Sequence, residues 1–425
     1  MDNVIAFPTP ESPFRQIGLS YSYEPAHLQV IFRADYLKRH GEELHGVLTV
    51  ETTRPGMKPH LHEASHNFSS MASRGTVAKY LSMFASDIDW RREMETFCVS
   101  VMRHHRLGDP MVLVGQCPDT LSEPDLLTTL LPHKRITWLF GEEGAGKGTL
   151  AVAWMVGIAS GQGFMHFPAR QGRVAYLDWE DDADSMDHRI KAVCRGLDIA
   201  APEVLYRRCR GPLSASLHGC AQQFETYGVD AYVVDSAILA SGVGSEHGDA
   251  ADSAHGLVDA LNILNRTVLV IDHVAKNEAL NGRLPARPYG SVMKRAWARQ
   301  AWEIRKDQEP GRREFTIGLY HNKFNHGSLQ PPLGIKVMWS EDSQAVTFAK
   351  TDVRESPILM QGGTLASQIE NILTHDPGLT IAEVAATLGV GVKDDSVRRT
   401  LERHEGKKFL RVSDGWACLA RTYAS

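Results

Sequence analysis

The stretch Leu139-Phe-Gly-Glu-Glu-Gly-Ala-Gly-Lys-Gly-Thr-Leu-Ala151 lies between an apolar run, residues 136–140, and a helix-like segment, residues 150–159. A strand, a glycine-rich turn and a helix in this order are the setting that a phosphate-binding P-loop requires. A glycine-rich turn without this setting would be weak evidence. The sequence therefore predicts a phosphate-binding site at this point of the chain.

The residue types in this loop explain how it would hold a phosphate. Gly141, Gly144 and Gly146 let the backbone curl so that its N–H groups face an anion. The N-terminus of the following helix adds partial positive charge, and Lys147 is expected to reach the β- and γ-phosphates of a nucleotide. The residues predicted to bind the nucleotide are Gly141, Glu142, Glu143, Gly144, Ala145, Gly146, Lys147, Gly148, Thr149 and Leu150.

One position departs from the usual motif, in which a Ser or Thr follows the lysine and binds Mg²⁺ through its hydroxyl. Here Gly148 follows Lys147, and Thr149 comes one place later. Thr149 is expected to touch an inner phosphate, and it is kept as a candidate Mg²⁺ ligand. The spelling Gly-Lys-Gly-Thr also occurs in adenylate-kinase-like enzymes, so a nucleoside-monophosphate kinase is an alternative. The acidic motifs that follow the loop argue against that alternative.

Composition and charge narrow the class of protein. A chain of 425 residues is long enough for two or three domains, and its net charge of −5 gives no overall signature of nucleic-acid binding. Six cysteines without a Cys-x-x-Cys pair indicate reduced thiols. No signal peptide and no membrane-length apolar run are evident, so a soluble, cytoplasmic protein without a membrane partner is expected.

Residues 1–110 are predicted to form a small accessory α+β domain that begins with a loose arm of about 22 residues. Strands are expected at 28–32 and 46–52, and helices at 70–84 and 90–104. This domain precedes the P-loop, and its residues do not indicate a function.

The segment Lys58-Pro-His-Leu-His-Glu-Ala-Ser-His66 in this domain carries three histidines. A metal site there would need a fourth ligand and a rigid frame, so a solvated polar loop is the favoured interpretation. Residues 111–133 contain several prolines and are interpreted as a linker to the next domain.

Residues 134–355 alternate apolar strands with helical segments. Apolar strands between helices indicate an α/β fold with a mostly parallel sheet, covered on both faces, that binds ligands at the carboxyl ends of its strands. The last three strands are expected to be antiparallel. The expected strands are 136–140, 174–178, 232–235, 268–272, 313–320, 334–339 and 344–349.

Two of these strands end in carboxylates that suit nucleotide hydrolysis. Glu180 is the candidate general base that polarises water for attack on the γ-phosphate. Asp178 precedes it by two residues, so both are expected on the same side of the strand. An acidic helix cap is the alternative, since the run up to Asp184 suits a helix N-terminus. Asp235 ends a later strand and is the candidate Mg²⁺ ligand, partly through water.

Further candidates follow the acidic strands. His273 lies just beyond the strand 268–272 and is a candidate to contact the γ-phosphate or Glu180, with a structural histidine as the alternative. Cations in residues 289–305 and 321–327 are candidates to reach the γ-phosphate bound by a neighbouring subunit. A solvated basic face is the alternative for these cations.

Residues 364–425 are predicted to form a separate small domain. Helices are expected at 364–373, 381–388 and 397–404, followed by a hairpin at 409–419. This order of elements is the plan of a winged helix-turn-helix domain.

Basic residues on the third of these helices suggest a role in binding DNA. The predicted DNA-binding residues are Arg398, Arg399 and Arg403. Such a helix can enter a major groove or hold phosphates. Winged helices also bind proteins, and Arg398 could instead pair with Glu402 one turn later.

The ordered motifs, from the P-loop through Leu-Asp-Trp-Glu180, Val-Val-Asp235-Ser and Asp-His273-Val-Ala-Lys to Gly-Ser-Val-x-x-x-x-x-Ala-Arg299, resemble the RecA-like ATPases. More narrowly, they are similar to the RepA-type helicases of plasmids and phages, within the AAA-family ATPases. The resemblance covers about residues 134–350. It implies that Glu180 is the catalytic glutamate, Asp235 the Walker B carboxylate and His273 the sensor.

The resemblance also bears on two cations and on assembly. It implies that Arg299 lies near a subunit interface and that Lys323 acts in trans from a late hairpin, although the Lys-x-Arg-x-Gly pattern of replicative helicases is absent. It further implies ATP and Mg²⁺ as cofactors, and a homo-oligomeric ring of six subunits with single-stranded DNA in its channel. Residues 277–287 are the candidate channel loop.

These inferences predict a DNA-dependent ATPase, a helicase or translocase, that acts in replication or recombination of a mobile element. The alternative is an ATP switch protein of the same fold that binds DNA or a protein partner without translocation. A pure transcription factor is disfavoured because such a role does not need Glu180.

Overall fold

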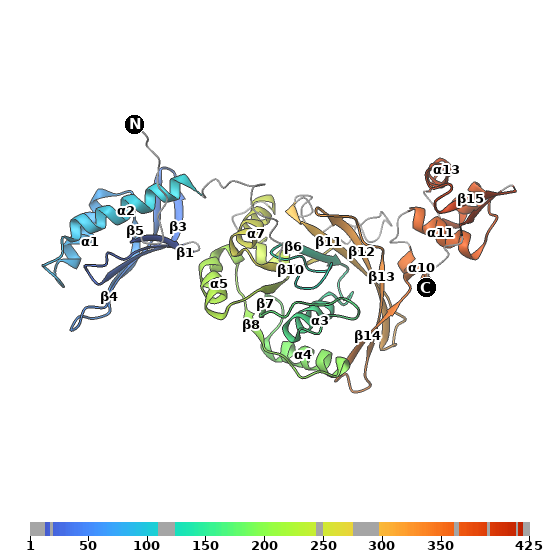
Figure 1. Ribbon diagram of the computed structural model, residues 1–425, viewed down its shortest axis with the longest axis horizontal. Helices are drawn as coiled ribbons and strands as arrows, with labels where there is room; N and C mark the ends of the chain where they lie inside the picture. The colour runs from blue at the N-terminus through green and yellow to red at the C-terminus, as the bar shows by residue number, and fades with distance from the viewer. Residues whose placement is uncertain are drawn as a thin grey trace. The chain divides into compact units, whose positions relative to one another are not determined.

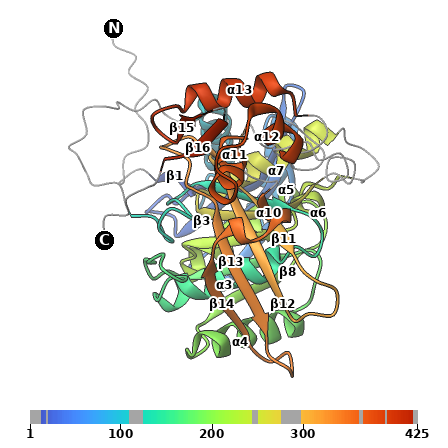
Figure 2. The same cartoon turned by 90° about the vertical axis from the view of Figure 1, so that its right-hand side faces the viewer.

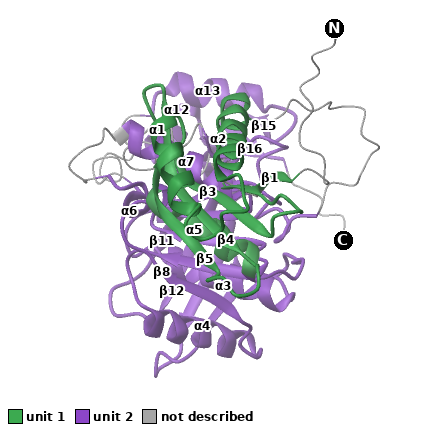
Figure 3. Ribbon diagram, turned by 90° about the vertical axis from the view of Figure 1, so that its left-hand side faces the viewer, with its two compact units in different colours: residues 1–122, 215–226 green, residues 123–214, 227–425 purple. Residues whose placement is uncertain are grey.

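In the computed structural model the described residues are 13–17, 20–108, 124–243, 250–274, 297–360, 365–388, 392–413 and 415–419. The chain divides into two compact units (Figures 1 and 3). The first contains residues 1–122 and 215–226, and the second contains residues 123–214 and 227–425.

The first unit contains a five-stranded antiparallel sheet with the order β1-β2-β3-β4-β5. Its strands are β1 (Phe14–Ile17), β2 (Ser20–Tyr23), β3 (Val30–His40), β4 (Glu43–Thr52) and β5 (His60–Asn67). Two helices, α1 (Met71–Leu81) and α2 (Trp90–Leu107), pack on one face of this sheet (Figure 1). Ser70 and Asp89 cap these helices with their side chains, as their residue types favour.

Two segments of this unit differ from the sequence prediction. Residues 14–23, expected in a loose arm, contain β1 and β2, because the rings of Phe14 and Tyr23 pack against Phe97 of α2. The histidine segment, expected in a polar loop, forms β5 because it pairs with β4 and buries His66. Among the described residues, no group of three or more His, Cys, Asp or Glu side chains could hold a metal ion.

The second unit is built on a nine-stranded sheet with the order β14-β13-β12-β11-β6-β10-β9-β7-β8. The strands from β11 to β8 in this order are parallel to their neighbours, and β12, β13 and β14 join antiparallel. The strands are β6 (Ile136–Gly141), β7 (Val174–Asp178), β8 (Val204–Arg208), β9 (Ala231–Asp235), β10 (Thr267–His273), β11 (Gln300–Asp307), β12 (Glu314–Phe324), β13 (Leu333–Trp339) and β14 (Val346–Thr351). The predicted α/β class with a mostly parallel sheet is confirmed.

Two strands of this sheet were not predicted. β8 is a half-buried edge strand, and β11 lies in the middle of the sheet between β6 and β12. The apolar pattern of β11 is interrupted by Gln300 and Glu303, which are nevertheless buried. Thr137 donates to the Gln300 side chain at 3.2 Å, and Asn322 donates to Glu303 at 2.8 Å. These polar residues find their hydrogen-bond partners only in the folded chain. The local sequence therefore lacks the continuous apolar pattern that would indicate a central strand.

Helices cover both faces of this sheet (Figure 1). α3 follows the P-loop and is almost wholly buried, which explains its nearly continuous apolar sequence. α3 and α4 share one hydrophobic core with the face of the sheet beneath them, and α7 lies on the opposite face. The helices of this unit are α3 (Lys147–Ser160), α4 (Ala183–Leu197), α6 (Ala237–Ser241), α7 (Ala250–Leu264), the short 3₁₀ helix η1 (Val353–Glu355) and α10 (Pro357–Met360). Most of α5 (Leu213–Tyr227) belongs to the first unit.

The last part of the chain contains three helices and a hairpin, in the order that the sequence predicts (Figure 2). The elements are α11 (Leu365–His375), α12 (Ile381–Leu388), α13 (Asp394–Arg403), β15 (Phe409–Val412) and β16 (Gly415–Cys418). They share a core that includes Ile369, Leu401 and Trp416. α13 begins three residues earlier than expected, because Asp394 and Asp395 suit the first turn of a helix.

No helix among the described residues is both long enough and apolar enough to cross a membrane. The five cysteines that lie in the described part of the chain form no disulfide.

Candidate functional site

The P-loop connects β6 to α3 and turns through two glycines with left-handed backbone conformation. The φ angles of Gly144 and Gly146 are 70° and 92°, which residues with a side chain rarely adopt. Gly141 is required for another reason. A Cβ atom there would lie 2.3 Å from the carbonyl oxygen of Ile304 on the neighbouring strand β11. The role expected for Gly141 in curling the loop is therefore corrected: this glycine permits close packing of two strands.

Lys147 occupies the centre of the loop. Its side chain is buried, with 5% of the residue exposed, and Nζ donates to the carbonyl oxygens of Gly141 and Glu142 at 3.0 and 2.6 Å. Burial lowers the pKa of the ammonium, while the nearby carboxylates of Asp235 and Glu180 oppose that shift. The nearby carboxylates therefore stabilise the positive charge of Lys147 even though the side chain is buried.

A cavity of about 1380 Å³ opens above the loop. Seven of the ten residues predicted to bind the nucleotide line it; the exceptions are Gly141, Ala145 and Leu150. Ala145 and Leu150 belong to the hydrophobic core beneath the loop. The residues that line the cavity are Glu142, Glu143, Gly144, Gly146, Lys147, Gly148, Thr149, Glu180, Arg189, Asp235, Ser236, Ile238, Leu239, Ile271, His273, Val274, Lys306, Phe315 and Trp339.

Strand register explains why acidic residues far apart in sequence meet at this cavity. β10 lies between the P-loop strand β6 and the Asp235 strand β9. His273 is level with Gly141, and Asp235 is level with both Ile271 and Asp178 on the adjoining strands. Since these strands are parallel, their carboxyl ends lie at one edge of the sheet.

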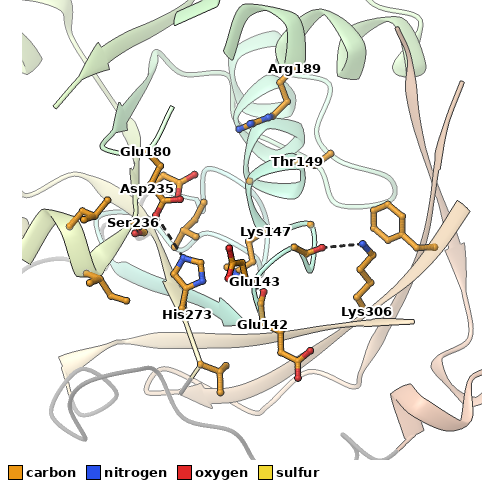
Figure 4. Close-up of a pocket in the computed structure, with 18 of the residues that line it drawn as sticks. Glu142, Glu143, Lys147, Thr149, Glu180, Arg189, Asp235, Ser236, His273 and Lys306 are labelled. Carbon is orange, nitrogen blue, oxygen red and sulfur yellow. Dashed lines mark hydrogen bonds and ion pairs between the residues drawn. The ribbon is translucent and has the colours of Figure 1, made fainter. Parts of the chain in front are cut away.

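Glu180 lies at this edge in contact with two other cavity residues (Figure 4). Ser236 Oγ donates to Glu180 Oε1 at 2.5 Å, and His273 Nε2 lies 3.7 Å from the same oxygen. The His273 side chain, and then the Ser236 hydroxyl, hold the pKa of Glu180 below its usual value. A carboxylate that stays ionised beside the phosphate site is able to accept a proton from an attacking water.

Asp178 and Glu180 do not lie on the same strand, although residue alternation predicted that they would share one side of it. β7 ends at Asp178, so Glu180 lies in the turn after the strand and not on it. Asp178 is 1% exposed, and its Oδ1 accepts the backbone N–H groups of Glu180 and Asp181, each at 2.9 Å. Asp178 therefore orients the turn that carries Glu180. The cap of α4 is Asp182, whose side chain accepts the N–H of Ser185, so Glu180 is not needed as a cap.

Asp235 is half-buried beside Tyr176, whose hydroxyl donates to Asp235 Oδ2 at 2.6 Å. Burial, helped by repulsion from Glu180 and Asp178, raises the pKa of Asp235 to about 6. An oxygen donor at this position fits Mg²⁺, which usually keeps several waters and takes one or two protein carboxylates beside substrate phosphates.

Thr149 does not share the Asp235 side of the P-loop helix. Figure 4 shows Asp235, Glu180, Ser236 and His273 on one side of Lys147, and Thr149 on the other, toward Lys306. Consecutive residues of a helix point about 100° apart, so the Thr149 side chain points in a different direction from a side chain at position 148. Both residues line the same cavity, and the assignment of Thr149 as a Mg²⁺ ligand stays a prediction.

Several cavity residues were missed by sequence reasoning. Lys306 donates from Nζ to the carbonyl oxygen of Gly144 at 3.1 Å and lies 4.5 Å from the centre of the Phe315 ring. Trp339 and Arg189 also line the cavity. These side chains come from β11, β12, β13 and α4, so no local motif links them to the P-loop.

Arg299 and Lys323 lie near the amino-terminal ends of the parallel strands, whereas the cavity lies at their carboxyl ends. Arg299 immediately precedes β11, and its N–H donates to the carbonyl oxygen of Ile136 at the start of the P-loop strand. Lys323 on β12 is level with Ala301 on β11. Neither residue lines the cavity.

The predicted DNA-binding arginines lie on α13, and all three are exposed. Arg398 pairs with Asp395 at 3.6 Å and not with Glu402. Arg411 of the hairpin lies 3.7 Å from Glu402 and 3.3 Å from Glu405. The candidate channel loop, residues 277–287, lies outside the described residues.

A family model matches the part of the chain that carries the P-loop. Residues 104–279 match the family model of an AAA domain. No curated protein matches the sequence. The crystal structure of a KaiC-like protein from the hyperthermophilic archaea Pyrococcus horikoshii OT3 is similar with a TM-score of 0.37 and 13% identity, covering 56% of this chain and 100% of that one. A likeness at that level defines neither fold nor function. The residues that match the AAA-domain model include the P-loop and the parallel strands β6, β7, β9 and β10, whose ends lie at the cavity.

Proposed function

We propose that this protein is a DNA-dependent ATPase of the RepA type, a helicase or translocase that acts in replication or recombination of a mobile element. The observation that supports the ATPase part of the proposal is the contact of Glu180 with Ser236 and His273 at the rim of the P-loop cavity. Nucleotide binding alone does not need an ionised, oriented carboxylate at this place, whereas hydrolysis does.

The site residues divide the work of hydrolysis among them. Lys147 and the loop N–H groups hold the phosphates, and Asp235 would hold Mg²⁺ through water. Bound Mg²⁺ neutralises charge that develops on the phosphate oxygens. Glu180 takes a proton from the attacking water, and Asp178 keeps the turn of Glu180 in place. His273, in contact with Glu180, senses the state of the site from the end of β10.

The positions of Arg299 and Lys323 support action in trans. β6 runs from the level of Arg299 to the P-loop, and a strand of that length spans roughly 16 Å, so these cations cannot reach the phosphates of their own subunit. In a ring of six subunits they would lie where a neighbour presents its cavity. Such a ring would enclose single-stranded DNA.

The C-terminal module is proposed to act as a winged helix that contacts DNA. Arg398, Arg399 and Arg403 are exposed on α13, where a helix can meet phosphates or the edge of a groove. This contact would bring the motor to its substrate.

The proposal is tested by ATP turnover with and without single-stranded DNA, for the parent protein and Glu180→Gln. We expect several-fold stimulation by DNA. Glu180→Gln should lower turnover roughly 10²- to 10⁴-fold while nucleotide still binds, as loss of a general base does. Turnover that ignores DNA would contradict the motor proposal, and turnover that survives Glu180→Gln would contradict the base assignment.

Action in trans is tested by mixing subunits. One variant carries Glu180→Gln, and the other carries Arg299→Ala with Lys323→Ala. If the cations serve a neighbour's cavity, mixing two inactive proteins should restore part of the turnover, because some interfaces then have both an intact base and intact cations. If the cations act within their own subunit, mixing should restore nothing.

A specific observation favours one alternative, an ATP switch that binds a protein partner. Lys408 lies 2.7 Å from Glu370, Arg398 pairs with Asp395, and Arg411 lies near two glutamates. These pairs reduce the net positive charge that DNA would meet. ATP turnover and assembly that do not respond to DNA would select this alternative.

A further inference from the structure

The space above Gly148 is bounded by Asp235 and by Arg189 of α4. A Cβ atom at position 148 would lie 3.3 Å from Arg189 Nη1 and 3.7 Å from Asp235 Oδ2. In an ordinary P-loop this is the place of the Ser or Thr side chain whose hydroxyl binds Mg²⁺. In this protein a guanidinium group stands at the edge of that place.

The Arg189 side chain is held in position by an ion pair with Asp181. Its Nη2 donates to Asp181 Oδ2 at 3.0 Å, and Asp181 follows Glu180 in the turn that Asp178 orients. The Arg189 side chain is 27% exposed and lines the cavity. One nitrogen of the guanidinium is thus engaged with Asp181, while Nη1 is directed to the space above Gly148.

The chemistry of arginine suits a phosphate at this place. Its planar group offers several N–H donors and keeps its charge, so it can hold one carboxylate and donate to a phosphate oxygen at the same time. The fixed charge also lies close enough to Asp235 to favour the ionised carboxylate there.

We propose that Arg189 contacts the β- and γ-phosphates of the bound nucleotide from the position where other P-loops place a metal-binding hydroxyl. A side chain at position 148 would come into tight contact with Arg189 Nη1 and would push the guanidinium group aside by a few tenths of an ångström. Nucleotide binding in this protein therefore depends on a fixed cation in addition to Mg²⁺. This inference rests on the proposed nucleotide site but is independent of DNA.

The consequence is an altered dependence on Mg²⁺. A P-loop that relies on a metal-ligating hydroxyl loses much of its affinity when Mg²⁺ is removed. Here Arg189 stays in place, so the parent protein should keep most of its affinity for ADP and for a non-hydrolysable ATP analogue in the presence of a chelator.

The test is calorimetric titration of the full chain with both nucleotides, in Mg²⁺ and in excess EDTA. Arg189→Gln should weaken binding in EDTA by roughly tenfold or more, because a charge-assisted hydrogen bond is lost, and should weaken it less in Mg²⁺. Lys191→Gln removes one positive charge from the exposed face of the same helix and should leave both affinities unchanged. An Arg189→Gln protein that matches Lys191→Gln in EDTA would overturn the proposal.

A second pair of variants tests the steric part. Gly148→Ser should weaken binding because the new side chain displaces Arg189. The double variant Gly148→Ser with Arg189→Ala should bind again, now with a strong requirement for Mg²⁺. If Gly148→Ser alone binds like the parent protein, the steric argument is wrong. A parent protein that binds no nucleotide at all would instead contradict the proposed function.

Discussion

Buried ionisable groups occur in both units of this protein, and burial disfavours their charged forms in both, but the charges that surround them differ. In the first unit, His66 is 3% exposed; its Nδ1 lies 3.1 Å from Ser73 Oγ, and its Nε2 lies 3.8 Å from Cys98 Sγ. Burial lowers the pKa of His66 to about 4 and raises the pKa of Cys98 to about 12. Both groups are therefore neutral at pH 7.

At the P-loop cavity a buried lysine lies among carboxylates of opposite charge, of which Asp235 is half-buried and Glu180 is exposed. Lys147 faces Asp235 and Glu180, and these carboxylates support its charge against the effect of burial. Arg189 supports the charge of Asp235 in the same way. A cavity lies beside them, so a charged ligand can take part in the balance.

The difference shows when a shifted pKa indicates a functional site. In the first unit the charged neighbours of His66 add to the effect of burial. His62, Arg74 and His45 are basic residues, and all three disfavour the protonated form of His66. His66 and Cys98 therefore serve packing. A shifted pKa points to chemistry where opposite charges and an open cavity accompany it, as around Lys147.

The largest effect that would test this comparison is expected from Lys147→Ala. Loss of the ammonium removes charge-assisted hydrogen bonds to phosphates, so nucleotide affinity should fall by about a hundredfold or more. Calorimetric titration measures the change, with Lys191→Ala on the surface of α4 as the matched control. Near-parental affinity in the Lys147 variant would mean that the cavity is not the nucleotide site.

A smaller effect is expected from Asp178→Ala, which frees the two N–H groups that orient the Glu180 turn. Turnover should fall by roughly ten- to a hundredfold, because misplacing a general base loses part of its contribution, while nucleotide affinity stays close to parental. Asp178→Asn keeps an oxygen acceptor for these N–H groups, so its turnover should lie between that of the parent protein and that of Asp178→Ala. Equal turnover in all three proteins would leave Asp178 without a positioning role.

The two regions should respond to pH with opposite sign. His66 has a lowered pKa, so the unfolded chain binds a proton that the folded chain does not, and the free energy of unfolding of the first unit should rise between about pH 4 and 6.5. Asp235 has a raised pKa, so its contribution to stability is present at low pH and is lost as pH rises from about 3.8 to 6. Each effect is at most about 1.4 kcal/mol per pH unit.

Denaturant unfolding, followed by separate probes in each unit, measures these slopes without nucleotide. Nucleotide with Mg²⁺ should reverse the Asp235 effect, because metal binding needs the ionised carboxylate. Equal signs in the two units would contradict the comparison.

The smallest effect is expected from His66→Gln. The change keeps a polar group but disturbs the contacts with Ser73 and Cys98, and should cost about 1 kcal/mol of unfolding free energy in the first unit. Nucleotide affinity should not change. The rise in stability between pH 4 and 6.5 should also disappear, and its persistence would mean that another group titrates there.

Much of the core was predictable because its signals are local. All seven predicted strands of the large sheet are present, and the P-loop, Glu180, Asp235 and His273 reach one edge, as parallel strands with acidic ends imply. β11 was missed because Gln300 and Glu303 find their partners only in the folded chain. The first two strands of the accessory unit were missed because short apolar segments near a terminus look like a loose arm until their rings meet Phe97.

The sequence by itself determined the chemistry of this protein: a phosphate loop, a lysine, and carboxylates at the ends of apolar strands, since each depends on residue types at fixed local spacing. Tertiary structure alone decided which groups complete the site. Arg189, Lys306, Phe315 and Trp339 reach the cavity from separate elements, and Gly141 is glycine because another strand passes within contact distance. These contacts join residues tens to hundreds of positions apart, so they exist only when the sheet order and register bring the elements together.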